Sequence, residues 1–175
     1  MISKKLQDAI NDQINKELFS EYLYISMKSW CLSNDLEGFA NWMDVQSKEE
    51  RFHAMKFYNF INDRGGRIIL KAIDAPQADF KSPEDVIDTG LKHEYTVTAS
   101  INKIMDLAIA ESDHAAASFL KWFIDEQVEE EANFTKVLNK VKLSGGAGAG
   151  LFMIDQELAK RVYTPPAGAA ADTAA

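Results

Sequence analysis

The chain has 175 residues, of which 46% are hydrophobic, and this is enough for one folded domain with a substantial core. Its formal net charge of −8 argues against a surface that binds nucleic acid and favours the attraction of cations, while a single cysteine excludes a disulfide framework and any multi-cysteine metal site. The first residues lead into an amphipathic helix and no long apolar run follows, so we expect no signal peptide, no membrane span and a cytoplasmic protein.

Hydrophobic residues recur at helical spacing in four long stretches, which predict helices over about residues 4–33, 36–64, 83–111 and 113–143. Short polar turns separate the first helix from the second and the third from the fourth, so each pair should form a tight hairpin. The intervening residues 67–82 contain Pro76 and no helical period, and they read as one long connection. Two hairpins joined in this way predict an all-α four-helix bundle with a single crossover.

A short fifth helix is predicted over about residues 151–163, after a hinge rich in Gly and Ala. Its apolar face has no place in a four-helix core, so we expect it to pack on other subunits; this face consists of Leu151, Phe152, Ile154 and Leu158. Residues 165–175 are expected to be a disordered tail, which leaves 1–164 as the domain.

In each of the four long stretches, the stripe of core-facing positions at helical spacing, here called the seam, is interrupted by polar residues. These are Glu17, Gln46, Glu50, His53, Glu94, Gln127 and Glu130. These interruptions lie at similar distances from the hairpin turns, so they should face one another at the middle of the bundle. Glu94 follows Glu17 by 77 residues, and the same offset relates Gln127 to Glu50 and Glu130 to His53. The two hairpins therefore repeat each other, and a pseudo-two-fold axis should pass through the polar layer.

Buried charges without partners cost several kcal/mol each, so a carboxylate-rich layer predicts bound cations. The four glutamates Glu17, Glu50, Glu94 and Glu130 supply a charge of −4, which two divalent ions would balance. An isolated Glu-x-x-His is more often a surface contact, but Glu50 and His53 lie on the seam opposite Glu17. Oxygen ligands with one imidazole suit iron or manganese.

Several neighbouring residues have two readings. Gln127 and Glu130 are either ligands and their supports or tolerated polar core residues bonded to each other. Tyr24 is either a core aromatic residue or a phenol that hydrogen-bonds a ligand or donates an electron. Glu49, Glu126 and Glu129 are either solvated helix charges or an additional cation site.

Taken together, these residues resemble the haem-free ferritins of bacteria and archaea over nearly the whole chain. The resemblance rests on six segments, which are Glu17–Tyr24, Leu36–Met43, Glu49–His53, His93-Glu94, Glu126–Glu131 and Leu151–Asp155. It implies a ferritin-like shell of twenty-four copies that oxidises Fe(II) with O2 or H2O2 and stores a ferric mineral.

The resemblance also implies roles for single residues. Glu17, Glu50 and His53 would hold the first iron, with Glu50 bridging to a second iron that is held by Glu94 and lies near Glu130 and Gln127. The set Glu49, Glu126, Glu129 and Glu130 resembles a third iron site, and Tyr24 matches a tyrosine beside the dinuclear centre.

Two departures limit what is carried over. Bacterioferritins have a second Glu-x-x-His and a haem-ligating Met, but here Gln127/Glu130 and Arg51 occupy those places, so haem is not expected and the second iron should bind more weakly.

The alternative function is a di-iron oxidoreductase, such as a rubrerythrin-like peroxidase without a storage role, which a small dimer instead of a hollow shell would favour. A structural or DNA-coating cage is opposed by the acidic charge.

Overall fold

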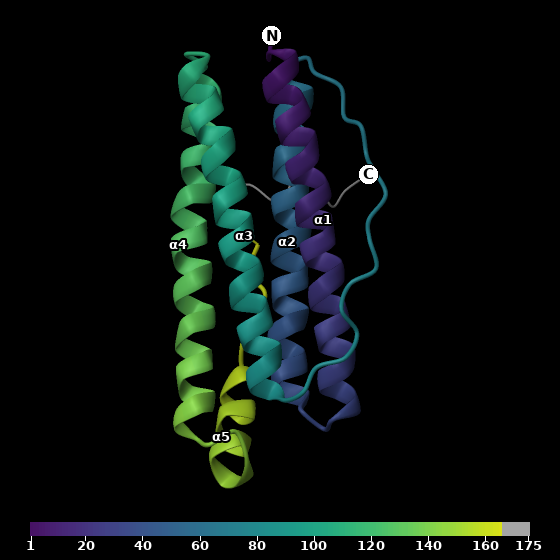
Figure 1. The fold of residues 1–175 in the computed structure, drawn as a ribbon, viewed down its shortest axis with the longest axis vertical. Helices are drawn as coiled ribbons and strands as arrows, with labels where there is room; N and C mark the ends of the chain where they lie inside the picture. Colours follow the sequence, from purple (N-terminus) through teal and green to yellow (C-terminus); the bar gives the residue numbers. More distant parts are fainter. Residues whose placement is uncertain (166–175) are drawn as a thin grey trace.

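The computed structural model describes residues 1–165 and contains five helices within that range. They are α1 (Lys4–Ser33), α2 (Glu37–Asp63), α3 (Pro83–Ala110), α4 (His114–Leu143) and α5 (Gly148–Leu158). The four long helices lie side by side, and α5 sits at one end of the bundle (Figure 1). The predicted bundle with one crossover and a short fifth helix is confirmed. The tail predicted to be disordered lies, from residue 166 onward, outside the described residues.

Local sequence signals begin three of the long helices. Ser3 accepts a hydrogen bond from the amide of Leu6, and Ser82 accepts one from Asp85 in front of Pro83 at the first turn of α3. Asp113 accepts a hydrogen bond from the amide of Ala116 at the start of α4. These contacts satisfy amide groups that have no partner inside the helix.

The hairpin turns repeat each other as the seam residues do. Asp35 in the first turn has φ 57° and Ser112 in the second has φ 55°, and the two are again 77 residues apart. A left-handed conformation is uncommon for residues other than glycine, so its recurrence at equivalent positions supports the pseudo-two-fold repeat.

The long connection runs outside the bundle alongside α1 and returns the chain to the end from which α3 starts (Figure 1). Polar side chains of α1 hold its backbone. Asn11 donates to the carbonyl of Arg67 at 3.0 Å and accepts from the amide of Ile69 at 2.9 Å, and Ser26 donates to the carbonyl of Gln77 at 2.7 Å. These contacts satisfy backbone groups in a segment without regular structure.

The core is divided into two apolar clusters with a polar layer between them. One cluster, towards α5, includes Tyr24, Phe39 and Phe134, and the other includes Phe57 and Phe123. Between them lie eight buried polar side chains, which are Gln13, Glu17, Gln46, Glu50, His53, Glu94, Gln127 and Glu130. The predicted interruptions of the seams therefore gather in one layer at mid-bundle.

Helix α5 differs from its prediction at both ends. It starts at Gly148 instead of 151 and ends at Leu158 instead of 163. It ends early because the Asn41 side-chain amide donates to the carbonyls of Leu158, Ala159 and Arg161, at 3.1, 3.3 and 2.9 Å. These bonds use a side chain of α2 in place of the next helical turn.

The apolar face of α5 was predicted to pack on other subunits, and for its main residues this is wrong. Ile154 and Leu158 are buried in the core cluster of their own chain, whereas Phe152 is 65% exposed. Asp155 accepts hydrogen bonds from the amides of Gly38 and Phe39, at 2.8 and 3.0 Å, and so caps the start of α2. A Cβ on Gly38 would lie 1.7 Å from the Asp155 carbonyl oxygen, so this approach requires glycine.

None of the helices formed by residues 1–165 is long and apolar enough to cross a membrane.

Candidate metal centre

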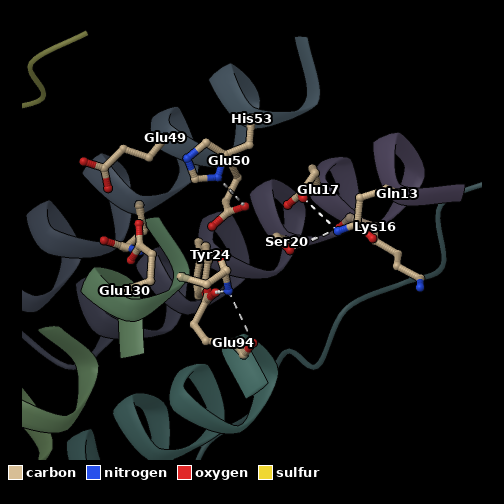
Figure 2. Close-up of polar contacts among 12 residues, drawn as sticks. Gln13, Lys16, Glu17, Ser20, Tyr24, Glu49, Glu50, His53, Glu94 and Glu130 are labelled. Atoms are coloured by element: carbon tan, nitrogen blue, oxygen red, sulfur yellow. Dashed lines mark hydrogen bonds and ion pairs between the residues drawn. The ribbon is translucent and has the colours of Figure 1, made fainter. Parts of the chain in front are cut away.

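Helices α1 and α2 bring three potential metal ligands together at mid-bundle. Glu17, Glu50 and His53 are buried, and one ligand atom from each lies within 4.8 Å of the other two. Glu50 and His53 project from the same face of α2 because they are three residues apart, and their closest atoms, Oε2 and Nδ1, are 3.5 Å apart. Figure 2 shows the Glu50 carboxylate pointing into the space between the four helices. Within residues 1–165, no other such group of three acidic, His or Cys side chains is found.

Glu17 is held from one side only. Its Oε1 accepts a hydrogen bond of 2.8 Å from Gln13, while its buried Oε2 has no hydrogen-bond partner. The Gln13 amide is oriented in turn by Ser100, which donates to its Oε1 at 2.6 Å and accepts from Lys16 at 2.5 Å. A buried carboxylate oxygen without a partner is costly, and a cation at that atom would satisfy it.

On the other side of the layer the carboxylates already have partners. The Tyr24 hydroxyl donates to Glu94 Oε1, and the Gln127 amide donates to Glu94 Oε2 at 3.1 Å and to Thr98 at 3.1 Å. Glu130 Oε2 accepts a hydrogen bond of 2.8 Å from Gln46. Gln127 and Glu130 therefore bind different partners, and the reading in which they bond to each other is wrong.

Burial dominates the electrostatics of the centre. It raises the pKa of Glu17 to about 7, and together with the neighbouring carboxylates it raises the pKa values of Glu50 and Glu130 well above their usual range. Burial, with a smaller effect from Lys56, lowers the pKa of His53 to about 4. The imidazole is therefore neutral at physiological pH, which is the form that binds metals.

Aromatic rings fix the orientation of the His53 imidazole. The ring lies edge-to-face against Trp122 at 5.5 Å and against Phe123 at 6.0 Å between centroids. Phe123 is stacked in turn on Phe57, one turn further along α2, at 3.9 Å. A ligand with restricted rotation needs less ordering when a metal binds.

The residues predicted for a third site are arranged differently. Glu49 is half-buried and forms an ion pair of 2.7 Å with Arg161, Glu126 is half-buried, and Glu129 is exposed. Together with Glu130 they do not form a compact group like that of Glu17, Glu50 and His53.

Sequence reasoning missed three residues of this region. Gln13 lies four residues before Glu17, a spacing that places it on the same helix face and could have indicated the contact. Gln46 was visible as a seam interruption without an assigned role. Arg161 gave no signal, because its contacts join residues more than 110 positions apart.

A four-helix bundle with one crossover that buries carboxylates and an imidazole at mid-length defines the class of bundle proteins with carboxylate metal sites. The chain matches the family model for the ferritin-like domain, Ferritin, over residues 7–144. It therefore belongs to the ferritin family, whose members store iron and act as ferroxidases.

Relatives and solved structures agree with this assignment. The chain is 42% identical to a bacterial non-heme ferritin of Staphylococcus saprophyticus and 41% identical to one of Staphylococcus aureus, each over 93% of this chain and 98% of the relative. It is also similar to an engineered closed form of the Archaeoglobus fulgidus ferritin, with a TM-score of 0.92, 43% identity and coverage of 94% and 100% of the two chains. An open pore ferritin of the same archaeon has a TM-score of 0.91 and 42% identity, with 93% and 100% coverage.

Proposed function

We propose that this ferritin oxidises Fe(II) at the polar layer inside each subunit. Glu17, Glu50 and His53 hold the first Fe(II), and Glu50 bridges to a second that is held by Glu94 with Glu130 and Gln127 nearby. The observation that carries the proposal is the buried Oε2 of Glu17, which has no partner and belongs to the same compact group as Glu50 and His53. Two divalent ions would balance the four buried carboxylates.

The oxidation follows from the ligand chemistry. Carboxylate oxygens are hard ligands and favour Fe(III) over Fe(II), so they lower the free energy needed to remove an electron. Each of the two substrate Fe(II) ions gives up one electron. O2 accepts both electrons with two protons and leaves as H2O2, or H2O2 accepts them with two protons and leaves as two waters. Tyr24, hydrogen-bonded to Glu94, orients this carboxylate towards the second ion.

We further propose that copies of the chain assemble into a shell of twenty-four that stores the ferric product, with an outer cation site at Glu49, Glu126, Glu129 and Glu130. The similarity to the closed and open pore forms of the archaeal ferritin supports the shell. Exposed apolar side chains are available for contacts between copies, among them Tyr22 on α1, Leu70 in the long connection, and Phe152 and Met153 on α5.

The site is tested by Glu50→Ala and His53→Ala. Each variant removes a proposed ligand of the first ion, so the initial rate of Fe(II) oxidation should fall about 100-fold. Substituting a residue that only supports a metal ligand typically lowers affinity or activity by about 10- to 100-fold, and loss of the ligand itself should reach the upper end of that range. His114→Ala is the matched control, because His114 is exposed at the start of α4. Oxygen consumption and the ferric absorbance measure the rate, and undiminished fast oxidation in both variants would refute the site.

Particle size separates storage from the alternative of a di-iron oxidoreductase. Light scattering on the purified protein, before and after iron loading, should give a particle of about twenty-four subunits whose mass grows with added iron. A dimer that consumes oxygen but retains no iron would favour the oxidoreductase.

A further inference from the structure

The segment after α5 brings a cation to the edge of the polar layer. It turns back along the bundle (Figure 1), and the Asn41 amide fixes its start through the carbonyls of Leu158, Ala159 and Arg161. The Arg161 guanidinium lies over the Trp42 ring at 5.1 Å, and its side chain is only 23% exposed. Arg161 is therefore held in place by α2 on two sides.

Arg161 determines how a buried amide is oriented. It donates to Glu49 Oε2 at 2.7 Å and to Gln46 Oε1. A guanidinium group can only donate hydrogen bonds, so Gln46 must turn its oxygen towards Arg161 and its amide nitrogen away. That nitrogen donates to Glu130 Oε2 at 2.8 Å. The guanidinium thus reaches a carboxylate of the centre through one intervening side chain.

We propose that Arg161 is a positioning residue that weakens metal binding on the α4 side of the centre and so promotes release of the oxidised product. This inference rests on the proposed function. The Arg161–Gln46 pair occupies Glu130 Oε2, neutralises Glu49 and places a positive charge beside these two carboxylates of the proposed outer site. A metal ion at that site must displace these hydrogen bonds and overcome the repulsion of the guanidinium. No guanidinium bonds to Glu17, Glu50 or His53 in the described part of the chain, so the first ion is unaffected.

The test measures metal binding directly, with Zn(II) as a probe that undergoes no redox change. Calorimetric titrations compare the wild-type shell with Arg161→Met, which keeps an apolar side chain over Trp42 and removes the charge. We expect the weaker class of Zn(II) sites to bind about tenfold more tightly, and the tight class to stay unchanged. Arg161→Lys should give an intermediate effect, because it keeps the charge but loses the two-pronged geometry.

A second arm asks whether the effect passes through Gln46. In Gln46→Leu the weaker class should also tighten, and adding Arg161→Met should have less than its single effect, because both changes free the same carboxylate. With iron, Arg161→Met should oxidise the first added Fe(II) at the wild-type rate but slow down over repeated additions. This split distinguishes product release from general damage to the site.

Lys140→Met is the matched control, because it removes an ion pair between α4 and α5 without touching Gln46 or Glu49. If it tightens the weaker class as Arg161→Met does, the effect comes from loosening the segment and the inference fails. An unchanged Zn(II) titration for Arg161→Met also overturns it. The proposed function fails separately, if the wild-type protein has no tight class of sites or if His53→Ala leaves that class intact.

Discussion

The two helical hairpins occupy equivalent positions in the bundle, but their buried polar residues differ in how they are hydrogen-bonded. In the α1–α2 hairpin, Glu17, Glu50 and His53 converge within 4.8 Å, and one carboxylate oxygen has no partner. In the α3–α4 hairpin, Glu94 and Glu130 each accept hydrogen bonds from neighbouring side chains. A metal ion in the first half would displace protons but would find one carboxylate oxygen without a hydrogen bond, whereas in the second half it would have to replace existing hydrogen bonds.

Under the proposed function, this difference would explain how one polar layer can both capture and release iron. A site with open ligands binds tightly, and a site whose ligands are already satisfied binds weakly, because each bond broken offsets part of the new one. The absence of a second imidazole at the position of Glu130 acts in the same direction. The two halves should therefore differ in affinity more than in geometry, and three further experiments test this comparison.

The largest effect should come from pH, because the open half must lose protons before it binds metal. Burial raises the pKa of Glu17 to about 7, so below pH 7 this carboxyl is mostly protonated and each bound ion must displace its proton. Through Glu17 alone, the affinity of the tight class for Zn(II) should fall about 50-fold from pH 7 to pH 5, and the decrease should be larger because the pKa of Glu50 is also raised and its carboxyl must lose a proton as well. His53, with its pKa lowered to about 4, stays neutral over this range.

The substitution Glu17→Gln tests whether the Glu17 carboxyl supplies a proton that metal binding displaces. It removes the proton together with the ligand charge, so binding should become weaker at pH 7 and depend less on pH by one proton. A slope that is the same in the variant and in the wild-type protein would show that another group supplies the proton.

Making the two halves alike should have the next largest effect. The double substitution Gln127→Glu with Glu130→His gives the second hairpin the ligand motif of the first, so its metal affinity should rise about tenfold. The oxidised ions would then be retained, and repeated turnover should slow while the first oxidation stays fast. Each single substitution serves as a control, and turnover in the double variant as fast as in the wild type would argue against asymmetry as the cause of release.

The smallest effect is expected from Tyr24→Phe, which tests the satisfied half. The ring keeps its stacking on Phe134, with centroids 5.8 Å apart, and only the hydrogen bond to Glu94 is lost. Initial oxidation measured by stopped flow should slow about threefold, because Glu94 is less well oriented. Tyr95→Phe is the control, since Tyr95 neighbours Glu94 in sequence but is 50% exposed. A rate in Tyr24→Phe equal to that of the control would make Tyr24 a purely structural residue.

The sequence predicted the long helices well because their signals are local. Helical spacing of apolar residues and the capping residues Ser82 and Asp113 act within one or two turns, and the predicted bounds of the four long helices agree with the structure to within one residue. The polar layer was also predictable, since the 77-residue repeat and the hairpin turns fix which residues lie at the same height. The role of each residue in iron binding stays a prediction.

The fifth helix shows where local reasoning stops. Residues 159–163 continue a helical pattern, but the structure ends α5 at Leu158 because an amide from α2 binds the carbonyls that follow. The start of α2 depends in the same way on Asp155, which lies 117 residues from Gly38. Neither contact has a signature in the sequence near the element that it changes.

By itself, then, the sequence determined the helices, the hairpins and the height of the polar layer, because these follow from spacing along the chain. Only the tertiary structure decided which carboxylate oxygens of the polar layer have no hydrogen-bond partner and which already accept a hydrogen bond. Tyr24 bonds to Glu94 across 70 residues and Arg161 to Gln46 across 115, and such pairings depend on packing between helices. The difference between the two halves of the centre arises from these long-range hydrogen bonds, since helical periodicity places a side chain on a face but does not choose its partner.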